Sequence, residues 1–374
     1  MDTPIYNCHI HTFTADHVVP AKFRRLVKAV RIPWLRLILL QIIGRLMFRM
    51  SKDSVILTNR FFARGALESQ QNIFEHVQKQ YPDKTRFIAL PMDLEFMGIG
   101  KPISSYEVQL KELAKLRDEN KNTLIPFSAV DPRRPNVVKE FKRWHEEYKI
   151  NGLKIYPNLG YYPDNPILME VYEYCEKNHL PVMAHCSPGG IRKLGISIEE
   201  AREFANPSNY KKVLEAFPKL HFCLAHFGGS EEWERHLTGG TPREGKDATW
   251  LTIIIDMLRE KKINSKARKY PNLYTDVSYT LFTETPSYRP FNYFNFLNVL
   301  LEDKAIRERV IFGTDYYMVE REKVSEMEVS IGMRAHLGEK LYFQIAHYNT
   351  RRYLYEINEN STVIESNKRK AKQK

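Results

Sequence analysis

The chain has 374 residues, of which 43% are hydrophobic and 12% aromatic, and this is the composition of a globular protein with a substantial core. Its net charge of +12 comes from two segments, because residues 22–52 hold nine Lys or Arg and no acid, and residues 359–374 hold five bases and two acids. The remaining body is neutral, which argues against a general nucleic-acid-binding protein. The four cysteines show no paired spacing and the N-terminus shows no leader, so we expect buried thiols in an unprocessed, cytoplasmic chain.

Short apolar runs alternate with helical patterns along most of the chain. Strands buried on both faces and separated by helices indicate a parallel sheet, and eight such units predict a closed (β/α)8 TIM barrel. An open, doubly wound sheet is the alternative, but no Gly-rich phosphate loop follows the first strand. The predicted strands are 4–10, 86–92, 124–130, 151–156, 181–186, 220–226, 273–278 and 309–314. The predicted helices are 104–120, 135–149, 166–179, 207–217, 249–262 and 291–306.

Two segments lie outside this alternation. Residues 22–52 predict a basic, apolar helical insertion after strand 1, placed over the barrel mouth and too short and charged to span a bilayer. Side chains such as Trp34, Leu39 and Ile42 are too apolar to lie exposed, so we favour packing on the barrel or on a second subunit. Peripheral binding to an anionic membrane is the alternative. Residues 359–374 read as a flexible basic tail, so residues 1–358 form one barrel domain.

Histidines and an aspartate close several of the predicted strands. His9 and His11 end strand 1, whereas His185, His226 and Asp315 end later strands. A lone histidine would be read as a hydrogen-bonded core residue, but the catalytic groups of a barrel gather at the C-terminal ends of its strands. Three imidazoles and one carboxylate suit a divalent metal such as zinc with a position open for water, and they leave His226 for proton transfer.

The sequence resembles the amidohydrolase superfamily through a set of short motifs. The resemblance is to the amidohydrolase-related branch that includes aminocarboxymuconate-semialdehyde decarboxylase, aromatic-acid decarboxylases and pyrone lactonases. It implies a site for one metal, with His9, His11, His185 and Asp315 as ligands and His226 as the acid/base residue. The motifs are His9-Ile10-His11, Gly152-Leu153-Lys154-Ile155-Tyr156-Pro157, Pro181-Val182-Met183-Ala184-His185, Ala225-His226-Phe227-Gly228-Gly229, Asp276-Val277-Ser278, Phe312-Gly313-Thr314-Asp315-Tyr316 and, for a closing C-terminal helix, Asn349-Thr350-Arg351-Arg352.

Three further residues have alternative interpretations. Lys154 either contacts substrate or the groups around the ligands, or pairs with a nearby acid, or is carboxylated and bridges two metals as in other branches of the superfamily. Asp276 and Ser278 share a strand face, where they either orient His226 or substrate or cap a layer of the barrel.

We therefore expect a metal-dependent hydrolase of an amide, ester or lactone bond in a small molecule. Asp315 would accept the proton of an activated water, and His226 would transfer protons near neutral pH. The alternative on the same scaffold is a non-oxidative decarboxylase of an unsaturated or aromatic carboxylic acid, and a third reading is a non-catalytic metal-binding barrel. One divalent ion is expected, zinc first and manganese as the alternative. The expected partners are a small molecule, a carboxylate if Lys154 binds it, no nucleic acid, and a second copy if residues 22–52 pack on one.

Overall fold

The computed structural model of the chain describes residues 3–48, 52–238, 248–280, 290–322 and 324–356. Each predicted strand is present, and all of the paired strands run parallel. The strands are β1 (Tyr6–Ile10), β2 (Arg86–Ala89), β3 (Leu124–Pro126), β4 (Ser128–Ala129), β5 (Leu153–Ile155), β6 (Val182–Ala184), β7 (Phe222–Leu224), β8 (Leu273–Asp276) and β9 (Val310–Ile311).

The run predicted as one strand at 124–130 is divided at Phe127 into β3 and β4, which belong to a three-stranded and a six-stranded sheet. Hydrogen bonds nevertheless continue across the break. The amide of Phe127 donates to the carbonyl of Ala89 at 3.0 Å, and the next amide, of Ser128, donates to Gly152 at 3.0 Å. A Cβ at Gly152 would lie 2.5 Å from the Phe127 ring, so only glycine fits beside this side chain.

The two sheets also meet where the first strand, β1, lies beside the last, β9, and we call this junction the seam. The amide of Cys8 donates to the carbonyl of Phe312 at 2.8 Å, and Ile10 forms a parallel bridge with Tyr316. These contacts close the two sheets into the predicted barrel. The C-terminal ends of β1 and β9 therefore lie side by side.

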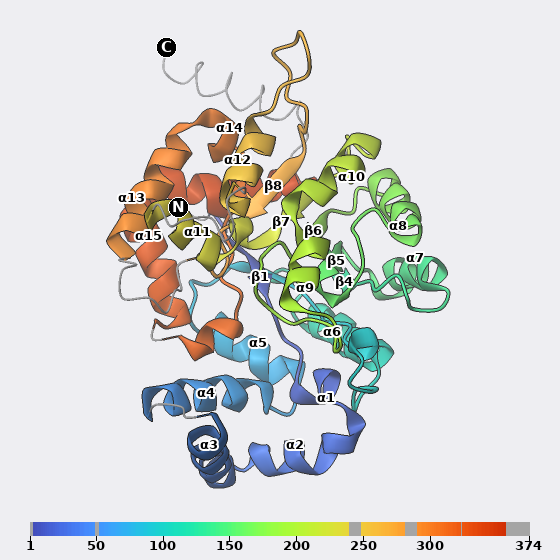
Figure 1. Cartoon of the computed structure of the whole chain (residues 1–374), viewed down its shortest axis with the longest axis vertical. Coiled ribbons are helices and arrows are strands. Elements are labelled where there is room, and N and C mark those ends of the chain that lie inside the picture. The colour runs from blue at the N-terminus through green and yellow to red at the C-terminus, as the bar shows by residue number, and fades with distance from the viewer. Residues whose placement is uncertain (1–2, 49–51, 239–247, 281–289, 323, 357–374) are drawn as a thin grey trace.

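Helices cover the outside of the barrel, as Figure 1 shows. They begin at side-chain caps where the sequence supplies them, as at Ser105, whose Oγ accepts the amide of Val108 at 3.3 Å. The helices after the insertion are α5 (Gln70–Gln78), α6 (Tyr106–Glu119), α7 (Val137–Tyr148), α8 (Pro166–Lys177), α9 (Ile198–Ala205), α10 (Lys211–Ala216), α11 (Ser230–Thr238), α12 (Trp250–Arg259), α13 (Pro290–Glu302), α14 (Lys304–Arg307), α15 (Glu326–Phe343) and α16 (Asn349–Tyr353).

The core has two layers. One lies between strands and helices, and the other lies inside the barrel, because its members come from strands all around the ring and can meet only there. Tyr353 of the C-terminal helix α16 joins the inner layer, so this helix closes one end of the barrel. The inner-layer residues that lie on the strands or directly after them are Tyr6, Cys8, Ile88, Leu90, Ile125, Phe127, Met183, Cys223, Ala225, Tyr274 and Ile311.

The predicted helical insertion follows β1 and the short helix α1 (Ala15–Val18). The predicted segment 22–52 contains α2 (Arg24–Arg31) and α3 (Pro33–Phe48), and the helical insertion continues beyond it through α4 (Lys52–Gly65). The three helices form a layer at one end of the molecule in Figure 1. The last helix, α4, packs on the 3-10 helix η6 (Met318–Arg321) that follows β9, whereas α3 mainly contacts α2 and α4. No helix in the described ranges is both long and apolar enough to cross a membrane. The basic tail predicted at 359–374 lies outside the described residues.

A buried polar cluster fastens the seam between β1 and β9. The Nδ2 atom of Asn7 donates to the hydroxyls of Tyr81 at 3.0 Å and Thr314 at 2.7 Å. The Oε1 atom of Glu326, at the start of α15, accepts from Tyr81 at 2.6 Å and from Thr314 at 2.7 Å. Glu326 is fully buried, and this burial is the main reason why its pKa is raised to about 7.

Glu326 should make the unfolding free energy depend on pH. The native state keeps the Glu326 proton up to about pH 7, whereas the unfolded chain loses it near pH 4.3, so the unfolding free energy falls by about 3 kcal/mol as the pH rises through this window. The Glu326→Gln variant cannot ionise and should lose this dependence. Chemical denaturation at the two ends of the window checks it. The exposed control Glu119→Gln should keep the wild-type dependence, and the same slope in Glu326→Gln would contradict the prediction.

Candidate active site

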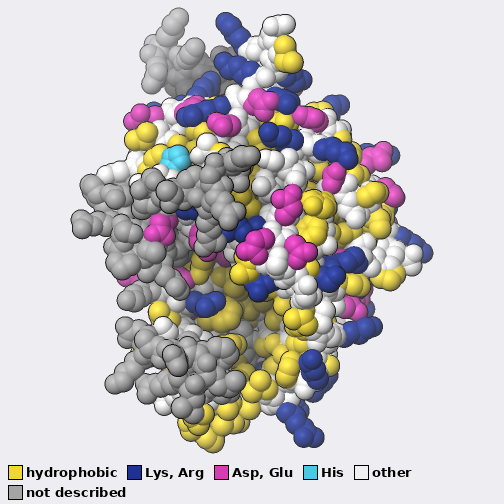
Figure 2. Space-filling model, in the orientation of Figure 1, with side chains coloured by type: hydrophobic (Ala, Val, Ile, Leu, Met, Phe, Trp, Pro, Cys, Tyr) yellow, Lys and Arg dark blue, Asp and Glu magenta, His cyan; other side chains and the backbone are white. Residues whose placement is uncertain are grey.

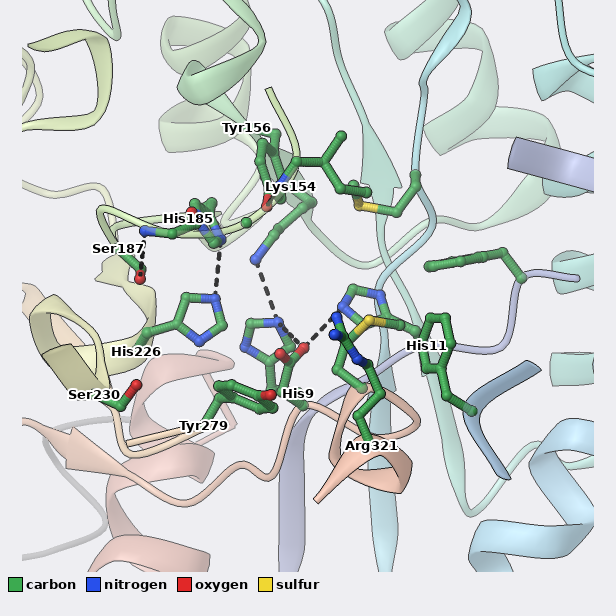
Figure 3. A pocket seen from close by; sticks show the side chains of 18 of the residues that line it. His9, His11, Lys154, Tyr156, His185, Ser187, His226, Ser230, Tyr279 and Arg321 are labelled. Atoms are coloured by element: carbon green, nitrogen blue, oxygen red, sulfur yellow. Dashed lines mark hydrogen bonds and ion pairs between the residues drawn. The ribbon is translucent and has the colours of Figure 1, made fainter. Parts of the chain in front are cut away.

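A cavity of about 440 Å³ opens at the C-terminal ends of the strands. Six of the eight predicted site residues line it. Figure 3 shows that the side chains of its three strand-end histidines His9, His11 and His185, and those of Lys154 and His226, point toward a common centre. Asp276 and Ser278 lie behind this wall. The lining residues are His9, His11, Phe13, Phe61, Met92, Lys154, Tyr156, His185, Ser187, Gly189, Gly190, Ile191, His226, Ser230, Glu231, Tyr279, Asp315, Met318 and Arg321.

Three of the predicted ligands, His9, His11 and Asp315, form one compact group. The Oδ1 atom of Asp315 lies 3.0 Å from His11 Nε2 and 3.4 Å from His9 Nε2. The two strands can approach so closely because residue 313 is glycine, where a Cβ would lie 2.8 Å from that of His9. The group therefore depends on the seam between β1 and β9.

The hydrogen-bond partners of Nδ1 in these two rings show which ring nitrogen faces the cavity. The Nδ1 atom of His11 lies 2.8 Å from the carbonyl of Leu90, and that of His9 lies 2.9 Å from Asp276 Oδ2. Both partners accept, so Nδ1 carries the proton in each ring and Nε2 presents a lone pair. Two lone pairs thus face one carboxylate oxygen, which is unfavourable without a cation between them. These donors fit a divalent metal.

The fourth predicted ligand, His185, lies in the same cavity but outside this compact group. Its Nδ1 atom is 3.0 Å from His226 Nε2, and its Nε2 atom is 3.0 Å from the carbonyl of Gly189. The Nδ1 atom of His226 is 3.1 Å from the carbonyl of Ser278. Because both carbonyls accept, the two rings turn lone pairs toward each other, so this pair also requires a shared proton or a cation.

Asp276 and Ser278 hold the histidines from behind. The Oδ1 atom of Asp276 accepts the backbone amide of His226 at 2.9 Å, while Oδ2 faces His9. The Ser278 hydroxyl donates to Asp276 and lies 3.0 Å from Nδ1 of both His9 and His226. Asp276 and Ser278 were predicted either to orient His226 or substrate or to cap a layer of the barrel. Their contacts are those of orienting groups, and these contacts reach His9 as well as His226.

Lys154 projects from β5 into the centre of the cavity. Its Nζ atom lies 3.4 Å from His9 Nε2, and no ion pair joins it to a carboxylate in the described part of the chain. Burial lowers its pKa to about 8, against the raising effects of Asp276 and Asp315. No direct contact therefore supports the alternative in which Lys154 pairs with a nearby acid.

The chain matches the sequence model of a known protein family. The amidohydrolase family model matches residues 105–354, which is more than half of the sequence. The chain belongs to this amidohydrolase family. The amidohydrolase is therefore an enzyme. No curated protein sequence matches it.

Solved structures show the same fold at low identity. A 5-carboxyvanillate decarboxylase from Sphingomonas paucimobilis is 14% identical, with a TM-score of 0.52 over 95% of the amidohydrolase and 99% of that chain. A probable 2-pyrone-4,6-dicarboxylic acid hydrolase from Acinetobacter baumannii with citric acid bound is 13% identical, with a TM-score of 0.52 over 94% and 98%. A 5-carboxyvanillate decarboxylase from Novosphingobium aromaticivorans, with bound manganese and 3-methoxy-4-hydroxy-5-nitrobenzoic acid, is 12% identical, with a TM-score of 0.52 over 95% and 97%.

Burial keeps three of the site imidazoles neutral, those of His9, His185 and His226. It is the largest cause that holds the pKa of His9 and of His226 well below the usual value, and the nearby Lys154 lowers both further. The pKa of His185 falls to about 3, with burial first and Lys154 next. Neutral rings are the form that binds a metal. In this environment His226 starts as a neutral base, and its role in proton transfer stays a prediction.

The sequence analysis did not predict several residues that line the amidohydrolase cavity. The Tyr156 ring stacks on His185 at a centroid distance of 4.1 Å, and its two-residue spacing from Lys154 was the signal that could have found it. Arg321 lies on η6, where its guanidinium is 5.9 Å from the centre of the Phe61 ring of α4. No local motif marks these last two residues, because they come from segments outside the repeating β/α units.

Proposed function

We propose that this amidohydrolase is a metal-dependent hydrolase that cleaves an amide, ester or lactone bond in a small, carboxylate-bearing substrate. The observation that carries the proposal is the convergence of His9 Nε2, His11 Nε2 and Asp315 Oδ1 on one side of a cavity that also holds His226. A non-catalytic metal-binding barrel needs ligands, but it has no need of a separate proton-transfer residue beside an open cavity.

His9, His11 and Asp315 would hold the metal, with His185 as the proposed fourth ligand. A divalent ion there would supply Lewis-acid chemistry that activates water and polarises a carbonyl group. Zinc is the proposed ion because imidazoles with one carboxylate are typical of catalytic zinc sites. Manganese is the alternative, and it is the ion bound in the Novosphingobium neighbour.

Protons would move through Asp315 and His226. Asp315 belongs to the compact ligand group and lines the cavity, so its carboxylate is placed to accept the proton of an activated water. His226 is neutral, and its Nδ1 proton is held by the carbonyl of Ser278, so Nε2 is the atom that would take a proton and later return it to the leaving group. Asp276 fixes the backbone from which this ring projects.

Decarboxylation is the second candidate, and the character of the cavity wall favours it. Rings of Phe13, Phe61, Tyr156 and Tyr279 line the cavity together with the cations Lys154 and Arg321. Such a wall suits a flat, unsaturated carboxylic acid, in which a proton would replace carbon dioxide. Two of the neighbours named above are decarboxylases of an aromatic acid.

Product analysis with the purified, metal-loaded enzyme tests both reactions. The panel contains lactones, esters and amides of dicarboxylic acids together with hydroxylated benzoic acids. A new carboxylate from a cleaved lactone, ester or amide supports the hydrolase, whereas release of carbon dioxide from a benzoic acid contradicts it and supports the second candidate.

Elemental analysis of the same preparation should give one divalent ion per chain. Less than about a tenth of an equivalent would contradict a catalytic metal, and two equivalents would favour a carboxylated Lys154.

Arg321 should contribute to substrate binding more than to turnover. Its side chain lines the cavity without an ion pair to any carboxylate in the described ranges, so its charge is available for an anionic substrate. We expect Arg321→Gln to raise KM for a carboxylate substrate about tenfold with little change in kcat, since an exposed charge contact is modest. Steady-state kinetics measures this. The control is Arg192→Gln, an exposed arginine outside the cavity wall, and equal KM values for both variants would contradict the assignment.

A further inference from the structure

The helical insertion exposes apolar side chains that a globular protein normally buries. On α3, Trp34, Ile38 and Ile42 are spaced four residues apart and are exposed by 64%, 44% and 53%, so they form one face of the helix. Leu26 of α2 and the preceding Phe23 are also exposed. The favoured expectation was that this segment packs its apolar side chains on the barrel or on a second subunit, and the barrel does not cover this face. We call these five residues the apolar face.

Positive charges lie along the same helices. Lys22, Arg24, Arg25 and Lys28 are exposed, and no ion pair joins any of them to a carboxylate in the described residues. Two further bases of the insertion, Arg31 and Arg36, are already engaged. Arg31 pairs with Asp16 at 2.8 Å, and the buried Arg36 donates to Asn59 at 2.9 Å. Figure 2 shows hydrophobic side chains gathered over α2 and α3 at this end of the molecule, with Lys and Arg at their margin.

We propose that the apolar face and its four exposed bases dock the enzyme on an anionic membrane surface. Apolar side chains on one side of a helix enter the boundary between headgroups and acyl chains, and flanking Lys and Arg contact anionic headgroups. No described helix can cross the bilayer, so the contact is peripheral.

Charge decides between a membrane and a second copy of the chain. Residues 22–52 contain nine Lys or Arg and no acid. A symmetric contact between two copies would bring this segment against itself, which places like charges together around the apolar side chains. An anionic lipid surface supplies the opposite charge over the whole face, and it requires no acidic partner residue from the chain.

The face is separate from the cavity, although the same insertion reaches both. None of Phe23, Leu26, Trp34, Ile38 and Ile42 lines the cavity. The helix α4 carries Phe61 into the cavity wall and packs on η6, so α4 connects the docking helices to the barrel. Variants of the apolar face should therefore keep the folded structure and the basal activity on a soluble substrate.

Vesicle co-sedimentation of the full chain tests the proposal. The probes are vesicles of pure phosphatidylcholine and vesicles of equal parts phosphatidylcholine and phosphatidylserine. The wild type should bind the anionic vesicles at least about tenfold more tightly, and added salt should weaken the binding. Equal binding to both vesicle types, or binding to neither, would overturn the proposal.

Two double variants separate the contributions. Trp34→Ser with Ile38→Ser removes apolar area, and Arg25→Glu with Lys28→Glu reverses charge; each should weaken binding to anionic vesicles about tenfold or more. The matched controls are Ile263→Ser, an isoleucine exposed by 92% elsewhere, and Lys111→Glu with Lys121→Glu on and beside α6, and both should bind like the wild type. Circular dichroism checks folding.

Sedimentation equilibrium tests the other occupant. A wild-type dimer that dissociates in Trp34→Ser with Ile38→Ser, without vesicle binding by either protein, would overturn the proposal and assign the face to a second copy. A wild-type monomer that binds anionic vesicles supports the membrane contact.

Discussion

Replacing His226 by alanine should leave the metal in place and lower kcat by about 10²–10⁴-fold, which is the usual contribution of a general acid/base group. The ring lies outside the group of His9, His11 and Asp315, although it forms a second possible metal-holding group with His9 and Asp276. Its Nε2 atom is turned toward His185, and its Nδ1 atom is held by Ser278. Metal content by elemental analysis and turnover by steady-state kinetics are measured on the same preparation. His236→Ala, which removes a histidine that does not line the cavity, is the control.

The two measurements distinguish the roles of His226. A variant that loses its metal and regains activity when metal is added would show that His226 is a ligand, and our assignment would be wrong. Retained metal together with unchanged turnover would remove His226 from catalysis altogether. Loss of turnover with a full equivalent of metal supports the proposed role.

Replacing Asp315 by asparagine should have the larger effect on the metal. The Oδ1 atom of Asp315 faces both His11 Nε2 and His9 Nε2, and the amide keeps the shape of the side chain but removes the negative charge between these lone pairs. We expect metal affinity to fall by more than about 100-fold and turnover to fall to background, since ligation is coupled to the charge of the donor set. Competition with a chelator measures the affinity.

Asp276→Asn provides a graded comparison with Asp315→Asn. Asp276 reaches His9 only through Nδ1, so its replacement should weaken metal binding by about 10–100-fold, as for other groups that orient a ligand from behind. The exposed Asp118→Asn variant should bind like the wild type. Equal losses in Asp276→Asn and Asp315→Asn would contradict the proposed division between ligand and supporting residue.

The barrel could be predicted because each strand is a short apolar run between turn residues and helical patterns, and because all eight runs are buried on both faces. Phe127 illustrates what the pattern leaves out. The run at 124–130 reads as one strand, but its first part, β3, pairs with β2 and its second part, β4, pairs with β5, and this change of partner is a property of pairing between strands.

The candidate ligands could be predicted because parallel strands bring their C-terminal ends together, so residues far apart in sequence become neighbours. The same argument cannot give the direction in which a ring nitrogen points. His185 faces His226 rather than the compact group because the carbonyl of Gly189 holds its other nitrogen. Arg321 and Phe61 were missed because neither lies on a strand, and their meeting depends on the packing of α4 on η6.

The exposed face of α3 shows the limit of reasoning from composition. Apolar residues at helical spacing indicate a helix with a buried side, and in this chain they do form a helix. Periodicity does not say which neighbour covers that side. Trp34 remains exposed because α3 packs mainly on α2 and α4 with its other faces.

The seam between β1 and β9 sets an order for biosynthesis. His11 and Asp315 are 304 residues apart along the chain, so a ribosome that adds about 5–20 residues per second makes the first ligands roughly 15–60 s before the last. During that interval β1 lacks the neighbour to which its Cys8 amide donates, and the nascent chain carries an unprotected strand edge. Any ion held by His9, His11 and Asp315 must therefore arrive after the final strand has left the ribosome.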